Sequence, residues 1–119
     1  MRHASISVLR APASIAISAE DLARGYVDLA EPIEVAVRTN APEGVLLGMA
    51  LRTAEVHTVL LNGEAGLVRV ARAGATLPVA KEGRGLVTQV VRLRARLELS
   101  AAAAVGRIAF PIRLFVAPN

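Results

Sequence analysis

A strict alternation of apolar and polar side chains late in the chain limits the fold more than any other feature. In residues 91–99 every odd position is apolar, and the positions between them are Arg92, Arg94, Arg96 and Glu98. Successive side chains of a β-strand point to opposite faces of a sheet, so this segment has one apolar face and one charged face. The pattern predicts a strand that is buried on one side only.

The same alternation returns in residues 106–117. Its apolar face would carry Ile108, Phe110, Ile112, Leu114 and Val116. Because only a short alanine-rich segment separates the two alternating stretches, we expect them to pair as a long antiparallel hairpin. A tight register would place Arg107 opposite Glu98 and Arg113 opposite Arg92. Pro111 lacks a backbone donor, which favours an edge position for the last strand.

Similar strand signals recur along the whole chain. Ile33–Thr39 alternates cleanly, and Val45–Leu51 is almost entirely apolar, as expected of a central strand. Asn62-Gly63 is a typical type I′ turn pair and predicts a hairpin between two further strands. Ser18–Gly25 predicts a single capped helical turn. Turn signals about every 8–12 residues indicate one all-β domain over residues 1–119, an antiparallel β-sandwich of about seven to nine strands.

Composition sets limits on the core and on partners. The chain is 54% apolar but only 3% aromatic, so its core must be aliphatic, and the apolar surplus suggests surface covered by a protein partner or a second copy. The scarcity of aromatic side chains argues against nucleic-acid binding. No apolar run approaches the roughly 18 residues of a membrane span. The chain contains no cysteine, which excludes disulfides and thiol chemistry.

The charges are unevenly distributed. Residues 1–60 carry five basic and seven acidic side chains, whereas residues 61–119 carry nine and three. Arg92, Arg94 and Arg96 share one strand face, and Arg113 would join them on the neighbouring strand. We consider two interpretations: a binding face for an anionic ligand (a glycan, lipid or phosphate), or a solvated face that keeps the protein soluble.

Catalytic and metal-binding motifs are not recognisable. Glu55 and His57 would lie on the same side of a strand, but the spacing supplies no third metal ligand. The acidic residues Asp21, Asp28, Glu31 and Glu34 are more typical of a solvated loop than of a catalytic pair. We therefore predict a protein that is not an enzyme, with no catalytic residues, no metal site and no cofactor.

The closing segment Gly106–Pro118, GRIAFPIRLFVAP after an alanine-rich loop, resembles the last strand of bacterial secreted immunoglobulin-like subunits. Pilin-like and spore-coat-U-like proteins of chaperone–usher systems end similarly, with a glycine, an aromatic residue and alternating apolar residues. The chain differs from many of them in lacking cysteines and an N-terminal signal segment. The resemblance implies an immunoglobulin-like sandwich, located in the periplasm or outside the cell. A cytoplasmic location is the alternative.

The resemblance also implies assembly by donation of a strand to a neighbour's sheet. Residues 1–11 would be the extended or exchanged strand, because a sheet edge with unpaired backbone groups accepts an added strand. The apolar residues proposed to mediate self-association are Ile6, Val8, Ile15 and Ile17. The predicted function is a structural or protein-interaction module of a bacterial surface or periplasmic assembly, forming a homo-oligomer.

Overall fold

The computed structural model describes residues 2–64 and 66–117 and contains eleven strands and one short helix within them. All strand pairs are antiparallel, so the predicted all-β antiparallel class is confirmed. Eleven strands exceed the predicted seven to nine. The alternating ribbons at the two ends of the chain are each interrupted, at segments that contain Pro12 and Pro111, and each ribbon forms two strands.

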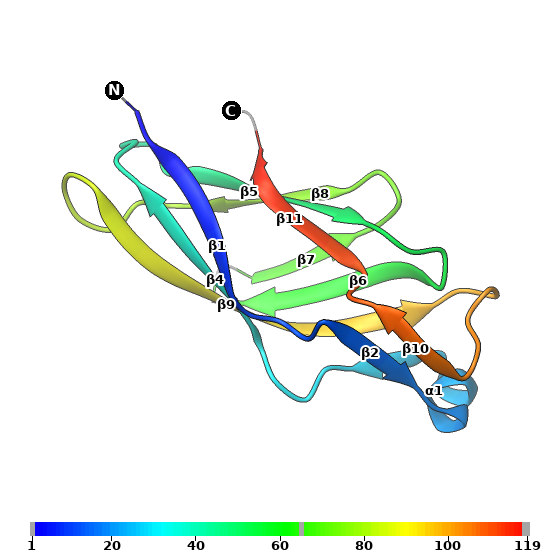
Figure 1. The fold of residues 1–119 in the computed structure, drawn as a ribbon. Coiled ribbons are helices and arrows are strands. Elements are labelled where there is room, and N and C mark those ends of the chain that lie inside the picture. The colour runs from blue at the N-terminus through cyan, green and yellow to red at the C-terminus, as the bar shows by residue number, and fades with distance from the viewer. Residues whose placement is uncertain (1, 65, 118–119) are drawn as a thin grey trace.

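The larger sheet is built around one long strand, β9 (Val87–Leu99). Its strand order is β1-β4-β9-β6-β7, and β3 pairs with β9 beside β4. The bounds of these strands are β1 Ala4–Arg10, β3 Tyr26–Asp28, β4 Ile33–Thr39, β6 Val56–Gly63 and β7 Gly66–Val70. β4 and β3 occupy one edge of β9, and β6 occupies part of the other (Figure 1).

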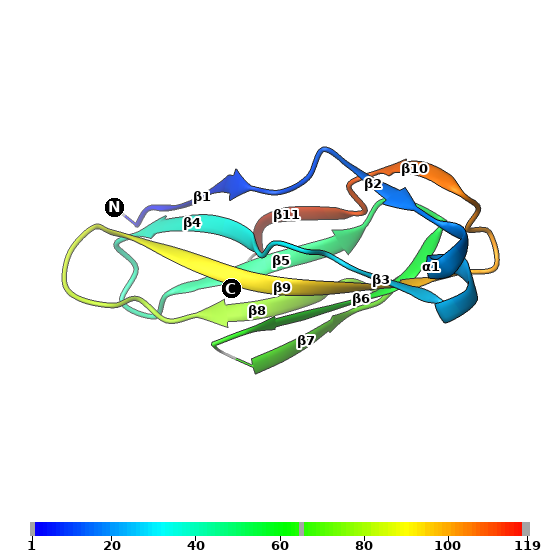
Figure 2. The same cartoon turned by 90° about the horizontal axis from the view of Figure 1, so that it is seen from below.

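The smaller sheet has the order β11-β5-β8, with β5 Val45–Leu51, β8 Ala75–Val79 and β11 Ile112–Ala117. A separate two-stranded ribbon joins β2 (Ser14–Ile17) to β10 (Gly106–Ala109). Figure 2 shows this ribbon beside helix α1 at one end of the molecule. The molecule is elongated, with extents of 49 × 25 × 22 Å.

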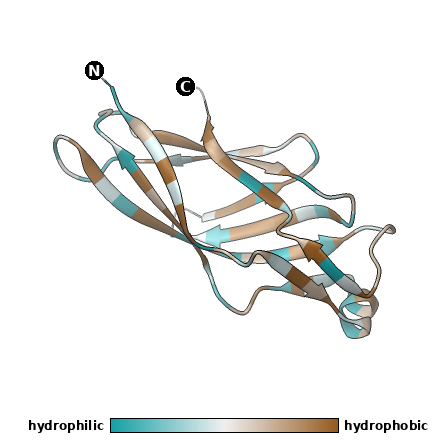
Figure 3. Cartoon of the chain, viewed as in Figure 1, coloured by the Kyte–Doolittle hydropathy of each residue, from teal (hydrophilic) through white to brown (hydrophobic). Residues whose placement is uncertain are grey.

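One aliphatic core joins the two sheets and the ribbon, an arrangement that fits a β-sandwich. Along the strands apolar and polar residues alternate, as Figure 3 shows. The fully or almost fully buried core side chains include Ile33, Val35, Val37, Val59, Leu61, Leu93 and Leu97 from the larger sheet and Leu47, Met49, Leu77 and Ile112 from the smaller one. The period-two pattern therefore predicted the buried faces of β4 and β9 correctly.

Strand β5 is the central strand of the smaller sheet, as predicted. Its Gly48 is required by the neighbouring strand, because a Cβ atom there would lie 2.3 Å from Cε2 of Phe115. The ring of Phe115 lies against the bare glycine backbone, in register with it. This contact explains the one glycine within an otherwise apolar strand.

The predicted hairpin between residues 86–99 and 106–117 is wrong. β9 pairs with β4, β3 and β6, whereas β10 pairs with β2 and β11 with β5. The segment Phe110–Pro111 separates β10 from β11 and lets the chain pass from the ribbon to the smaller sheet. Arg107 consequently lies opposite Ala16, and Arg113 opposite Ala50. β11 is nevertheless an edge strand, as Pro111 suggested.

Two local predictions have different outcomes. Helix α1 (Ala19–Arg24) is confirmed, with a Ser18–Asp21 capping box and Gly25 in the left-handed region at φ 87°. The β6–β7 hairpin is also confirmed, but Asn62 and Gly63 belong to β6, where they pair with Leu67 and Gly66, so the turn lies beyond them. Among the described residues, no helix is long and apolar enough to cross a bilayer.

Candidate functional site

The two edges of β9 are covered unequally. Ala95 accepts a hydrogen bond from the Leu29 amide (3.0 Å), and the Leu99 amide donates to Gly25 (2.8 Å), so odd residues direct their backbone groups toward β3 and β4. Backbone groups of neighbouring residues point to opposite edges, so those of even residues face the β6 edge.

Strand β6 covers that second edge over only part of its length. The register of β6 on β9 runs from Leu99 to Arg94, which lies opposite Asn62. Within the part of the chain that the structure describes, no strand pairs with the second edge of β9 over Val87–Leu93. The backbone N–H and C=O groups of Thr88 and Val90 therefore face an edge without a strand.

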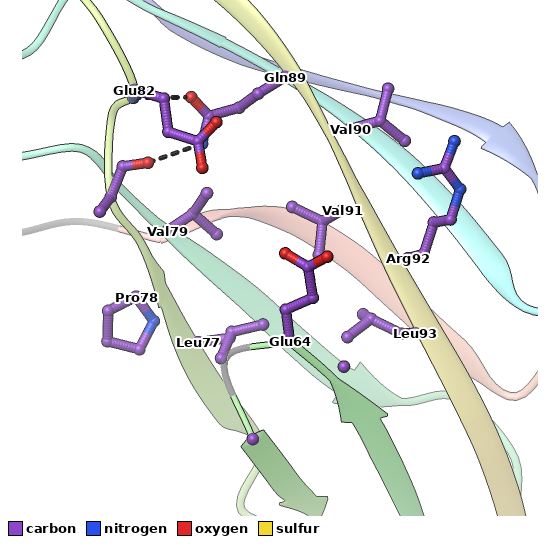
Figure 4. A pocket seen from close by; sticks show the side chains of 13 residues that line it. Glu64, Leu77, Pro78, Val79, Glu82, Gln89, Val90, Val91, Arg92 and Leu93 are labelled. Carbon is purple, nitrogen blue, oxygen red and sulfur yellow. Dashed lines mark hydrogen bonds between the residues drawn. The ribbon is translucent and has the colours of Figure 1, made fainter.

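A cavity of about 360 Å³ lies along this open edge, between β9 and β8. We call it the β8–β9 slot. Leu77 and Val79 of β8 and Val91 and Leu93 of β9 line its apolar side, and Glu64 points into it from the tip of the β6–β7 hairpin (Figure 4). The slot thus combines core side chains with an unpaired strand edge.

The slot exists because three elements diverge around it. The β6–β7 hairpin ends at Gly63 and Gly66, halfway along β9. A Cβ atom at Gly63 would lie 2.8 Å from the Arg92 carbonyl oxygen, so the hairpin tip packs against the β9 backbone there and goes no further. β8 does not close the gap, because it pairs with β5 in the other sheet.

A side chain bridges the far end of the slot. The Gln89 amide donates to the Ala80 carbonyl (2.6 Å), and its oxygen accepts from the Glu82 amide (3.1 Å), as the dashed lines in Figure 4 mark. Gln89 thereby supplies to the β8–β9 loop the hydrogen bonds that a neighbouring strand would supply. Lys81 stiffens the same loop by donating from Nζ to the carbonyls of Gly83 (2.8 Å) and Gly85 (2.9 Å).

The charged side chains around the slot are mostly acidic. Among the described residues, Glu64 and Glu82 have no ion-pair partner. The one arginine at the slot, Arg92, donates to Glu34 at 2.7 Å. The slot therefore carries uncompensated negative charge.

The predicted arginine stripe lies on the outer face of the larger sheet, but its members differ in charge compensation. Arg92 pairs with Glu34, and Arg96 makes a bidentate pair with Asp28 at 2.7 and 3.0 Å. The Arg96 guanidinium also lies 4.0 Å from the Tyr26 ring centre. These contacts lower the pKa of Asp28 and raise that of Arg96, mainly through the hydrogen bonds between them.

Arg94 lies between these two pairs and, within the described residues, has no carboxylate partner. The expectation that Arg113 joins the stripe is wrong. Arg113 belongs to the smaller sheet, where its guanidinium lies 5.0 Å from the centre of the Phe115 ring. The cause is the partner strand of β11, which is β5 and not β9.

The proposed self-association residues fall into two groups. Val8 is 47% exposed and Ile6 is half-buried on edge strand β1. Ile15 and Ile17 are only 5% and 2% exposed, because β2 pairs with β10 over the core. Only β1 therefore offers these apolar side chains at an accessible sheet edge.

The acidic residues noted in the sequence are dispersed into separate contacts. Asp21 caps helix α1 and pairs with Arg24, and its pKa is lowered chiefly by its hydrogen bonds with Ser18. Glu31 pairs with Arg10 at 3.0 Å. The His57 ring lies 2.8 Å from the Thr58 hydroxyl. The described residues contain no group of three or more potential metal-ligating side chains.

Sequence reasoning did not single out the slot residues. Glu64 follows the Asn62-Gly63 pair of a predicted turn, and Gln89 occupies an odd position in an otherwise apolar row. This break in the apolar row was an available signal, whereas the lengths of β9 (13 residues) and β6 (8 residues) are known only from the structure. Comparisons with protein-family models, with curated proteins and with solved structures return no match for this chain.

Proposed function

We propose that this protein is a non-enzymatic interaction module, an immunoglobulin-like sandwich whose β8–β9 slot receives an extended strand from another molecule. In this proposal it acts as a self-associating subunit of a bacterial surface or periplasmic assembly. The observation that carries the proposal is the unpaired edge of β9 over Val87–Leu93 beside an apolar cavity.

An extended segment suits both properties of the slot. Seven strand residues span about 23 Å, enough for an added strand to exchange hydrogen bonds with alternate residues of β9. Every second side chain of the added strand would face inward, onto Val91, Leu93 and Leu77. Backbone pairing would supply affinity, and the inward side chains would supply selectivity.

Strand β1 of a second copy is the occupant we propose. It alternates apolar and small polar residues, and it holds its own sheet through one edge only. Val8 and Leu9 remain 47% and 56% exposed, and the register of β1 on β4 shifts between Val8 and Arg10. An edge strand with so little buried apolar surface is among the first elements to detach.

Charge favours the same pairing. The segment before β2 carries Arg2 and Arg10 and no acidic residue. At the slot, Glu64 and Glu82 have no ion-pair partner among the residues that the structure describes. In its own fold Arg2 pairs with Glu43, and Arg10 with Glu31. An exchanged β1 would lose these exposed pairs, which are worth little, and meet two uncompensated carboxylates.

A proline at Val90 tests the proposal without touching the core. The Val90 amide faces the open edge and its side chain lies on the outer face, so Val90→Pro removes a donor that the monomer does not pair. Val90→Thr is the matched control, since it keeps the donor and the branched side chain. Light scattering across a concentration series should show self-association of the wild type and of Val90→Thr, and loss of it in folded Val90→Pro.

A second variant tests the donor strand. Val8→Asp places a charge on the apolar face of β1, the face that an exchanged strand would turn inward, and should weaken self-association as well. In hydrogen exchange the Val90 amide should become protected at concentrations where the wild type associates. A wild type that stays monomeric, or a Val90→Pro variant that associates normally, contradicts strand addition at the slot.

A further inference from the structure

The outer face of the larger sheet carries a second candidate site. Among the described residues, its charged side chains without an ion-pair partner are arginines, whereas those at the slot are glutamates. Residues in register on β9, β6 and β7 form two rows across this face. Arg94, Asn62 and Leu67 make the first row, and Arg96, Leu60 and Arg69 make the second. Side chains paired across strands share a face and lie next to one another.

A shallow cavity of about 400 Å³ lies over these rows. Leu60, Leu67, Asn62 and Arg94 are among the residues that line it. Leu67 is 66% exposed, so its aliphatic side chain is accessible to an apolar ligand group. The cavity therefore offers a small apolar surface next to hydrogen-bond donors.

The neighbouring charge pair isolates Arg94 electrostatically. Both carboxylate oxygens of Asp28 accept hydrogen bonds from Arg96, so this pair adds no net charge to the cavity. Arg94 faces the same cavity without a carboxylate partner among the described residues. A guanidinium binds phosphate and carboxylate groups through charge-assisted hydrogen bonds, and the neighbouring Asn62 amide can add a further donor.

We infer that Arg94 and Asn62 bind the head of a small amphipathic anion, whose apolar group lies on Leu60 and Leu67. The ligand class is an organic phosphate or carboxylate with a short alkyl or aryl substituent. The sequence pattern suggested a stripe of three arginines. Arg92 and Arg96 are held in ion pairs, which leaves Arg94 as the arginine of that stripe that binds the anion at the cavity. The site is independent of strand addition at the slot.

Hexyl phosphate and inorganic phosphate are suitable probes, because they share the head group and differ in the apolar part. Binding is followed by NMR titration of the Asn62 side-chain amide and the Arg94 Nε–H signals. We expect saturable shifts with hexyl phosphate and affinity several times weaker for inorganic phosphate. A titration with hexanoate in place of hexyl phosphate shows whether the site prefers a carboxylate or a phosphate head group.

Three variants separate this site from general surface charge. Arg94→Gln should weaken hexyl phosphate binding about tenfold, since charge-assisted hydrogen bonds are lost. Leu67→Ser should weaken hexyl phosphate but leave inorganic phosphate unchanged. Arg92→Gln removes another exposed guanidinium, one that already has a carboxylate partner, and should change the affinity for neither phosphate.

Each other outcome overturns the inference. Equal losses in Arg92→Gln and Arg94→Gln mean that only the overall positive charge attracts the anion. Equal affinities for hexyl phosphate and inorganic phosphate would mean that Leu60 and Leu67 do not contribute to binding. Absence of saturable shifts at Asn62 and Arg94 removes the site altogether.

Discussion

The two halves of β9 belong to one strand, yet their edges have different neighbours. Arg94–Leu99 has strands on both edges, and its odd residues Ala95 and Leu97 are buried. Val87–Leu93 has a strand on one edge only, and Val91 is half-buried beside the slot. In the proposed function, one end of this long strand serves as scaffold and the other as a binding edge.

The largest expected effect is on the free energy of unfolding when a valine in each half is shortened to alanine. Val59 packs opposite Leu97 in the closed half and is fully buried, whereas Val91 lines the slot. Val59→Ala should lower the free energy of unfolding by about 2 to 3 kcal/mol, and Val91→Ala by less than about 1 kcal/mol. Urea unfolding measures both, and equal costs would show that the open half is packed as tightly as the closed half.

Gly63 lies at the boundary between the two halves of β9. Adding a side chain there should have the next largest effect on the free energy of unfolding. A Cβ atom there would contact the Arg92 carbonyl oxygen and, at 2.9 Å, Cδ2 of Leu93. Gly63→Ala should therefore push the hairpin tip off β9 and cost about 1 to 2 kcal/mol. Asn62→Ala, on the exposed side of the same strand, is the control and should cost little. A neutral Gly63→Ala would mean that the tip does not press on β9.

Gln89 closes the end of the open half, and its loss should be milder. Gln89→Met keeps the length of the side chain but removes the bonds to Ala80 and Glu82, at a cost of about 1 kcal/mol. Hydrogen exchange of the Glu82 amide should accelerate in this variant. Lys81→Met leaves the Gln89 contacts in place, so Glu82 should remain protected there.

The smallest effect concerns the ion pair beside the closed half. The pKa of Asp28 is lowered by its hydrogen bonds with Arg96, so the pair stabilises the fold above the ordinary carboxyl pKa near 3.8 and loses its effect as the pH falls through the lowered value. Both side chains are about half exposed, so solvent screening keeps the contribution of this pair to stability small.

Arg96→Gln should therefore narrow the stability difference between pH 6 and pH 2.5, measured by urea unfolding. Arg94→Gln removes an arginine without a carboxylate partner and should leave that difference unchanged. An identical pH response of the two variants would show that Asp28 gains nothing from Arg96 in particular.

The sequence predicted the faces of the strands better than their partners. Period two correctly buries Leu93 and Leu97 and exposes the arginines between them. It carries no information about which strand lies alongside, and the short alanine-rich connection made the wrong hairpin the simplest interpretation. Pro111 signalled an edge strand, but not that the chain changes sheets there.

The candidate sites were harder to predict, because they depend on contacts between distant parts of the chain. Arg92 pairs with Glu34, 58 residues away, and Arg96 with Asp28, 68 residues away. Both partners belonged to what looked like an independent acidic patch. The slot depends on the register of β6 on β9, which ends at Arg94, and no local pattern encodes that end point.

The pairing of β2 with β10 affects how the chain can fold during its synthesis. Its pairs join Ser14 to Ala109 and Ile17 to Gly106. β2, the second strand to be synthesised, therefore cannot pair until β10, the second-to-last strand, has been synthesised. β5 likewise meets β11 only when residues 112–117 have left the ribosome. The nascent chain therefore has unpaired strand edges at β2 and β5 throughout translation. The incomplete chain, rather than the folded protein, is the form that most needs protection by chaperones.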